Sequence, residues 1–166
     1  MIFVTVGTDQ PFDRMMKVVV RWAGHAGRKD VFAQIGEGGW EPRHVPFVNF
    51  LEPVEFKDRF AQASLIVGHA GMGTILSALL HGKPILVMPK LARLGEHRNE
   101  HQTATAKRMM ELGNVNVAFD EDEMLSKLEI VDSLRPRTPI GSHASGPLIE
   151  GLRSFIFQGN GKGGLR

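Results

Sequence analysis

Short apolar runs alternate with segments of helical periodicity along most of this sequence. The runs typical of buried strands span residues 2–6, 31–35, 47–51, 65–68, 84–89 and 115–119. The segments expected to form helices span residues 12–23, 54–63, 74–81, 101–112 and 121–128. Buried strands separated by helices of this length predict an α/β fold, with a Rossmann-like parallel sheet and helices on both faces. Ligands of such folds bind beyond the carboxyl ends of the strands.

The length limits the number of domains that the chain can form. With 166 residues, of which 42% are hydrophobic, the chain is expected to form one domain with a sizeable core over residues 1–158. Residues 159–166 are rich in glycine and are expected to form a flexible tail. Residues 133–147 are expected to be a loop, followed by a last amphipathic helix over residues 148–157. This helix either packs on the sheet or offers a surface to a partner.

Composition narrows the functional classes. The sequence has no cysteine, which excludes disulfides and thiolate metal sites and fits a cytoplasmic protein. No apolar run approaches the roughly 20 residues that span a bilayer, and the first residues predict a strand and not a signal peptide. The net charge of +2 is compatible with simple solubility or with attraction to phosphates or an anionic membrane surface. Because no dense block of Lys and Arg with interleaved aromatics is present, we expect no nucleic-acid partner.

A glycine-rich motif at residues 67–74 joins a predicted strand to a predicted helix. Glycines let a backbone approach an oxyanion closely, and the amino end of a helix offers unpaired N–H groups and a positive dipole. The motif suits a diphosphate, although a turn that needs glycine only for packing would explain the same residues. Its spacing is neither that of a Walker loop nor that of the dinucleotide fingerprint. A second glycine turn, at Gly7 and Thr8, follows the first strand and can face the same ligand.

Polar or small residues also cluster at positions 94–102, between a predicted strand and a predicted helix. Hydroxyl-rich ligands need such a mixture of donors and acceptors in fixed geometry. A solvated helix start explains any one of these residues, whereas the cluster as a whole favours a binding site.

Three stretches taken together resemble the carboxy-terminal domain of family 28 glycosyltransferases. They are residues 69–74, 82–84 and 99–102, and the resemblance covers nearly all of residues 1–128. The chain is similar to small stand-alone subunits that pair with a separate membrane-bound subunit. One such group is the donor-binding subunit of the eukaryotic enzyme that adds the second N-acetylglucosamine to a dolichol-linked sugar. Another is the bacterial exopolysaccharide glycosyltransferase subunits, which residues 95–102 resemble most.

The resemblance implies half of a GT-B fold that holds a UDP-sugar donor. The first glycine turn would line the donor cleft, the second would cradle the diphosphate, and residues 99–102 would meet sugar hydroxyls. The implied donor-binding residues are Gly7, Thr8, His69, Gly71, Met72, Gly73, Thr74, Glu96, Asn99, His101 and Gln102. Many relatives carry a Glu at the position of Ser77, where it binds the ribose hydroxyls. In this sequence either Ser77 or Glu96 takes that role.

The implied reaction is an inverting hexosyl transfer without metal or cofactor, in polysaccharide or lipid-linked saccharide synthesis. UDP would leave while backbone donors and a helix amino end stabilise its growing negative charge. A membrane-associated partner would bind the acceptor and supply the general base, so this chain would be inactive alone and would lie at the inner face of the membrane. Asp9 and His25 are the alternative bases on this chain.

Two other functions compete with this hypothesis. His97, Glu100 and His101 match the His-x-x-Glu-His pattern of inverted zinc proteases, in which histidines four residues apart share one helix face. Glu100 would be the general base of such a zinc hydrolase, and Glu150 is the candidate third ligand. The other alternative is a nucleotide-binding or scaffold module that catalyses nothing.

Overall fold

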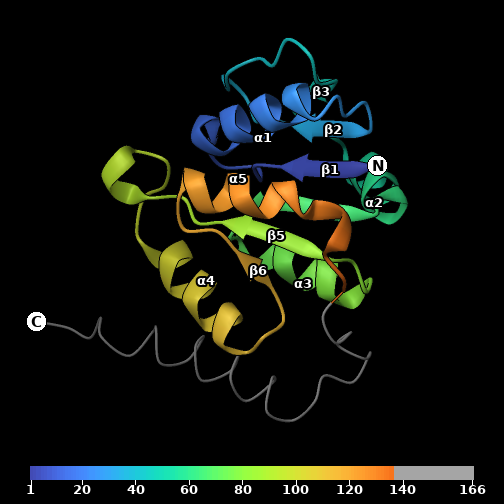
Figure 1. Cartoon of the computed structure of the whole chain (residues 1–166). Coiled ribbons are helices and arrows are strands. Elements are labelled where there is room, and N and C mark those ends of the chain that lie inside the picture. The colour runs from blue at the N-terminus through green and yellow to red at the C-terminus, as the bar shows by residue number, and fades with distance from the viewer. Residues whose placement is uncertain (137–166) are drawn as a thin grey trace, which may run out of the picture.

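A parallel sheet forms the centre of this protein in the computed structural model, which describes residues 1–136 (Figure 1). Its strands are β1 (Ile2–Thr5), β2 (Val31–Gln34), β3 (Phe47–Val48), β4 (Leu65–His69), β5 (Ile85–Met88) and β6 (Asn116–Val117). They lie in the order β3-β2-β1-β4-β5-β6, and each pairs in parallel with its neighbours. The predicted α/β fold with a parallel sheet is therefore confirmed.

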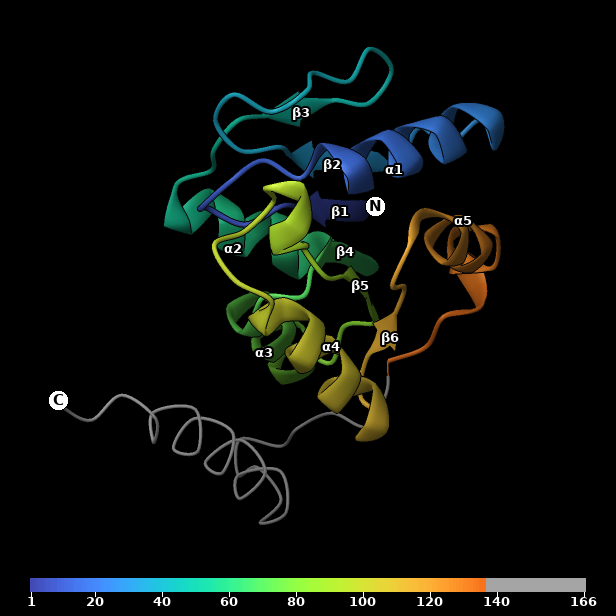
Figure 2. The same ribbon diagram turned by 90° about the vertical axis from the view of Figure 1, so that its left-hand side faces the viewer.

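Helices cover both faces of the sheet. They are α1 (Asp13–His25), α2 (Pro53–Gln62), α3 (Met72–Leu80), α4 (His101–Glu111) and α5 (Glu121–Glu129). Figure 2 shows α1 and α5 on one side of the strands and α2, α3 and α4 on the other, in agreement with the two apolar clusters of the core.

The alternation of side chains along each strand explains these two clusters. In β1, Ile2 and Val4 face α1 and α5, whereas Phe3 faces α2 and α3, and all three are buried. Neighbouring residues of a strand point to opposite faces, so a strand that is apolar on both faces has to be covered twice. Burial of each such side chain stabilises the fold by about 1.5–3 kcal/mol.

Glycines set several boundaries of these elements. The expected helix ends at Gly82 and Gly113 are confirmed, and both residues adopt positive φ, of 59° and 71°. Helix α3 begins at Met72, two residues before the predicted start, because Gly71 caps it in an extended conformation with φ −83° and ψ 135°. The glycine-rich motif therefore lies partly inside the first turn of the helix.

Some predictions concern residues outside the described range. The expected helix over residues 148–157, most of the expected loop over 133–147 and the expected tail over 159–166 lie there. The structure adds a short 3₁₀ helix, η1 (Ala92–Leu94), at the start of the polar cluster, and a second, η2 (Val131–Ser133), after α5. Within residues 1–136, no helix combines the length and the apolar character needed to cross a bilayer.

The strand order places a switch point at the centre of the sheet. From β1 the chain proceeds through β2 to β3 at one edge, and from β4 it proceeds through β5 to β6 at the other. Connections on the two sides of β1 and β4 therefore diverge, and they leave room beyond the carboxyl ends of these strands.

Candidate functional site

A cleft of about 300 Å³ opens at the carboxyl ends of β1, β2 and β4, beside the switch point. It is lined by Thr5, Gly7, Thr8, Gln34, Phe56, His69, Gly73, Thr74 and Ser77. The structure thus brings residues of both predicted glycine turns to one place, although they are more than 60 positions apart in the sequence. A parallel sheet does this because the strands that precede the two turns are direct neighbours.

The imidazole of His69 fills the space between the two glycine turns. A Cβ on Gly7 would lie 2.6 Å from Cε1 of this ring, and a Cβ on Gly71 would collide with its Nε2. Gly7 also has a φ of +83°, which favours glycine. At Gly73, by contrast, a Cβ would meet open space. Gly7 and Gly71 are therefore needed for packing, whereas Gly73 lies at the open cleft and lets a ligand approach the backbone.

His69 is neutral at physiological pH. Burial and, to a smaller extent, the positive charge of Lys90 lower the pKa of this residue to about 4, while the backbone of Thr5 opposes the shift. The cleft lining consequently carries no charged side chain. Its polar character comes from hydroxyls, an amide, an imidazole and backbone dipoles.

The amino end of α3 points its first N–H groups toward this cleft. No side chain in the described part of the chain caps the helix at Gly71. The N–H groups of Met72, Gly73 and Thr74 belong to the first turn and have no partner inside the helix. Two of these residues line the cleft, so their unpaired donors and the positive end of the helix dipole form a site for an anion.

Gln34 is a site residue that the sequence analysis missed. It is 1% exposed at the end of β2, and its Nε2 donates to the Gly7 carbonyl oxygen over 3.2 Å. Its Oε1 is buried and accepts no hydrogen bond from residues 1–136. Because a buried polar atom without a partner is costly, this oxygen indicates where a ligand donor would bind. A polar residue at the end of an apolar strand was the only sign of this role in the sequence.

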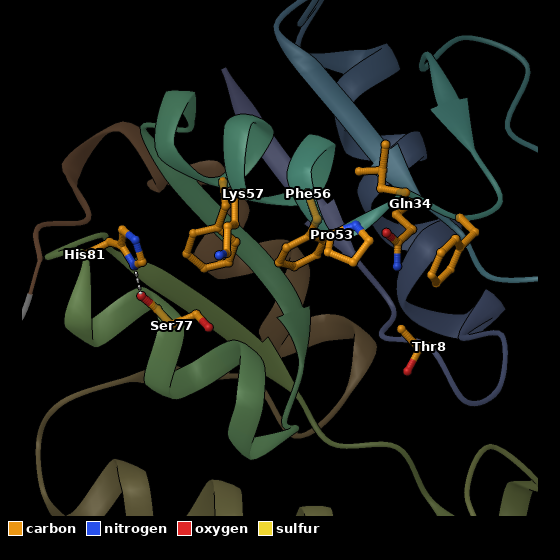
Figure 3. A pocket seen from close by; sticks show the side chains of 10 residues that line it. Thr8, Gln34, Pro53, Phe56, Lys57, Ser77 and His81 are labelled. Carbon is orange, nitrogen blue, oxygen red and sulfur yellow. Dashed lines mark hydrogen bonds between the residues drawn. The ribbon is translucent and has the colours of Figure 1, made fainter.

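An apolar cavity of about 350 Å³ adjoins the cleft (Figure 3). The two share Thr8, Gln34, Phe56 and Ser77. The remaining lining residues are Phe50, Leu51, Pro53, Lys57, Phe60 and His81. Figure 3 shows Phe56 and Lys57 of α2 opposite Ser77 of α3 and His81, which directly follows that helix. The anion site is thus continued by a space that suits a flat apolar group such as a nucleobase.

The polar cluster at residues 94–102 is tied to the protein by Glu96. The guanidinium of Arg14 donates to both carboxylate oxygens of Glu96, over 2.8 and 2.9 Å, and the N–H of Leu91 donates to one of them over 2.9 Å. The Arg14 side chain also donates to the Pro89 carbonyl oxygen. The Glu96 carboxylate therefore holds the loop against α1 in this structure, and it does not line either cavity.

The other predicted residues of this cluster lie around the start of α4. The Oε1 of Gln102 accepts the Lys90 N–H over 3.1 Å, and the Oδ1 of Asn99 accepts the N–H of His101 over 3.2 Å. Asn99, His101 and Gln102 are absent from the lining of both cavities in the described part of the protein. The structure thus brings the glycine turns together and leaves these three residues on an adjoining rim.

The zinc-site hypothesis is wrong in its geometry. Helix α4 begins at His101, so His97 lies before the helix and the two imidazoles do not share a helix face. The Glu100 carboxylate accepts the N–H of Arg93 and the hydroxyl of Thr103. Among residues 1–136, no group of three or more His, Cys, Asp or Glu side chains is placed to hold a metal ion. Glu150 lies outside the described residues.

The two candidate bases lie at opposite ends of the sheet. Asp9 belongs to the loop between β1 and α1, beside the cleft, where its carboxylate is 3.8 Å from Arg98. His25 is in the last turn of α1, which returns toward the amino ends of the strands. His25 is therefore too far from the cleft to act there, because α1 spans 13 residues, or about 20 Å.

The fold is that of one lobe of a GT-B glycosyltransferase: a parallel sheet with the uncapped start of a helix at its switch point. The chain belongs to the family described as "Glycosyltransferase family 28 C-terminal domain", whose model matches residues 1–137. This confirms the resemblance inferred from residues 69–74, 82–84 and 99–102.

Individual proteins agree with this assignment. The UDP-N-acetylglucosamine transferase subunit ALG13 of Mus musculus is 30% identical over 122 residues, which are 68% of this chain and 10% of that protein. The chain thus spans about a tenth of this curated relative. The match to the solution structure of ALG13 covers 91% of this chain and 93% of the ALG13 chain, with a TM-score of 0.59 and 21% identity. Os79 from O. sativa, solved in complex with UDP, covers 79% of this chain and 31% of its own, with a TM-score of 0.57 and 16% identity.

Proposed function

We propose that this chain is the donor-binding subunit of an inverting, UDP-sugar-dependent hexosyltransferase. The observation that carries the proposal is the uncapped amino end of α3, which meets open space at Gly73 and adjoins an apolar cavity. A nucleoside diphosphate has a matching shape, with two anionic phosphates at one end and a flat base at the other. The UDP bound by Os79 and the name of the ALG13 relative agree with this class of ligand.

In this proposal the donor follows the line of the two cavities. The diphosphate lies against the N–H groups of Met72, Gly73 and Thr74, below the loop that contains Gly7 and Thr8. His69 and Gly71 shape the turn behind it. The ribose lies near Ser77 and Gln34, which line both cavities, and the base enters the space beside Phe56. The sugar extends toward the rim formed by Asn99, His101 and Gln102, which Glu96 holds in place.

The reaction is a displacement at the anomeric carbon. An acceptor hydroxyl attacks this carbon from the face opposite to the diphosphate, the bond to the UDP oxygen breaks, and UDP leaves with the electron pair. The α3 N–H groups stabilise the negative charge that develops on the phosphates, without a divalent ion or a cofactor. A general base takes the acceptor proton, and we place it on a separate acceptor-binding subunit.

That separate subunit completes the enzyme in this proposal. One lobe of a two-lobed glycosyltransferase binds the donor, and the acceptor needs the other lobe. We infer that the partner is membrane-associated and that the complex makes a polysaccharide or lipid-linked saccharide at the cytoplasmic face of the membrane. This chain alone then binds the donor and transfers no sugar.

Calorimetry tests the proposal directly. UDP and a series of UDP-sugars are titrated into the wild type with and without Mg²⁺, and UDP is titrated into Thr74→Ala. We expect binding that does not depend on Mg²⁺ and that weakens in the variant. Ser126→Ala is the matched control, because the Ser126 hydroxyl bonds within α5 to the Asp122 carbonyl oxygen, away from the cleft. Failure of the folded wild type to bind UDP, alone and with a candidate partner subunit, would refute the proposal.

A further inference from the structure

Lys90 is a buried cation whose charge the donor site described above does not use. It lies two residues beyond the end of β5 and is 1% exposed. Its ammonium donates to the Gln10 carbonyl oxygen and lies 5.8 Å from the centre of the Phe12 ring. In the described part of the chain no carboxylate forms an ion pair with it. Buried lysines are rare unless paired, because desolvation of the ammonium is costly.

The position of Lys90 places this charge next to the cleft. Its ammonium contacts the loop of residues 7–10, which forms one wall of the cleft. Strand β5 pairs with β4 so that Met88 lies opposite His69, and Lys90 follows Met88 by two residues. The electrostatic influence of Lys90 on His69, which lines the cleft, shows that the charge is felt there.

The cleft lining carries no positive charge that could balance a negatively charged ligand. All nine lining residues are uncharged, because His69 is neutral. A diphosphate brings at least two negative charges, which dipoles alone neutralise only in part. A buried cation beside the cleft interacts with such a ligand more strongly than an exposed one would, because less water screens its charge.

We propose that Lys90 is the counter-charge for the diphosphate of the donor, and that it acts through the wall formed by residues 7–10. The inference rests on the proposed function. Lys90 is a positioning residue and does not touch the reacting atoms. It remains in its charged form near neutral pH, because burial lowers the pKa of Lys90 only to about 8, against the opposing effect of Asp9 and Glu96. A neutral side chain would be enough to hold the Gln10 carbonyl, so the loop contact alone does not explain the charge.

Three ligands that differ only in the number of phosphates distinguish an effect of Lys90 on ligand charge from an effect on the shape of the site. UDP, UMP and uridine are titrated into the wild type, Lys90→Met and Lys90→Arg. We expect Lys90→Met to lower the affinity for UDP about tenfold, to lower that for UMP less and to leave that for uridine within twofold. Lys90→Arg should retain most of the affinity for UDP. The stability of Lys90→Met should change little, because relief of the desolvated ammonium opposes the loss of its hydrogen bond to the Gln10 carbonyl.

Lys83 provides a matched control at the other end of β5. Its ammonium also donates to backbone carbonyl oxygens, those of Ala61 and Ala63, but it lies before the strand and away from the cleft. Lys83→Met should therefore lower stability and leave the ratio of UDP to uridine affinity unchanged. If Lys90→Met fails to fold, Lys90→Gln replaces it, since it keeps a donor for the Gln10 carbonyl, and the same loss for UDP alone is expected.

The outcomes distinguish this inference from the proposed function. Suppose that the wild type binds UDP and that a folded Lys90 variant loses affinity for UDP and uridine equally, or keeps both affinities. Lys90 then has only a structural role, and this inference is refuted while the proposed function stands. If the wild type binds uridine as tightly as UDP, no diphosphate site exists and both proposals fall. Selective loss of UDP in Lys90→Met, with recovery in Lys90→Arg, supports the inference.

Discussion

At the amino ends of the strands, the polar groups of the chain pair with one another, whereas at the carboxyl ends several of them keep no partner. Arg28 donates to Asp30 with two nitrogens and to Asp132 with a third, over 2.7–3.0 Å, and Lys83 donates to two carbonyl oxygens at the carboxyl end of α2. At the other end, the buried atoms without a hydrogen-bond partner within residues 1–136 are Oε1 of Gln34 and Nδ1 of His69.

This difference agrees with the proposal that the carboxyl end of the sheet binds a ligand. Unpaired buried groups reduce stability, and a fold retains them where a ligand completes them. The uncapped start of α3 and the buried charge of Lys90 lie at the same end as these two atoms. In our proposal the paired groups at the amino end stabilise the domain, and the unpaired groups at the carboxyl end lower stability in exchange for ligand binding. Each of the following predictions tests one part of this contrast.

The largest effect is expected from Gly71→Ala. The new Cβ would collide with the His69 ring, and we expect a loss of roughly 2–3 kcal/mol in the free energy of unfolding. Gly73→Ala is the control two positions later, where the Cβ meets open space. It should leave stability unchanged or raise it by about 0.5–1 kcal/mol, since alanine favours the helix, while UDP binding falls. Denaturant unfolding measures the stability of both variants. Equal losses in the two would contradict the packing of Gly71 against His69.

The second-largest effect is a loss of stability at acidic pH, caused by the protonation of His69. The folded pKa of His69, about 4, lies below the ordinary value of 6.5, so below pH 6.5 the unfolded state binds more protons than the folded state. The stability that His69 contributes is present above pH 6.5 and is lost as the pH falls toward 4. Between pH 6.5 and 5 this loss is about 2 kcal/mol.

Denaturant unfolding at several pH values measures this loss, and His69→Asn should flatten the profile. An NMR titration of the imidazole protons gives the pKa of His69 directly. A His69 resonance that titrates near pH 6.5 would refute the burial argument.

The sequence predicts the framework of this site better than its contents. Strand and helix periodicity, the stops at Gly82 and Gly113, and the Asp120 cap, which accepts the Glu123 N–H over 2.8 Å, depend on residues close together in the chain. These features can therefore be predicted without a structure. The two glycine turns are also visible in the sequence, and the family resemblance adds the UDP-sugar that they are expected to bind.

The contacts that organise the site join distant parts of the chain. Arg14 and Glu96 are 82 positions apart, and Lys90 and Gln10 are 80 positions apart. Such pairs follow from the order of the strands, which brings the β1 and β5 loops close together at one end of the sheet. For this reason the sequence alone indicates neither the roles of Gln34 and Lys90 nor the ion pair between Arg14 and Glu96.

A smaller effect is expected at the amino end. Arg28→Met removes the contacts to Asp30 and Asp132 and should lower the free energy of unfolding by about 1 kcal/mol, because the bidentate pair is only partly exposed. Asp132→Asn should cost less, since this side chain is 79% exposed. Neither variant should change the affinity for UDP. A clear loss of UDP binding at constant fold would show that the two ends are not independent.

The smallest effect is expected from Ser77→Ala, which sharpens the description of the carboxyl end. Ser77 lines both cavities and stands where many relatives carry a ribose-binding Glu. If its hydroxyl contacts the ribose, the variant should bind UDP and uridine about threefold more weakly, or about 0.6 kcal/mol, in line with the loss of one neutral hydrogen bond. The equal effect on both ligands distinguishes this residue from Lys90, which should affect UDP alone. The backbone carbonyl of Ser77 still accepts from His81 in the variant, so α3 keeps its last turn. Unchanged affinity for both ligands would move the ribose away from Ser77 and toward Gln34, whose Oε1 then becomes the acceptor to test.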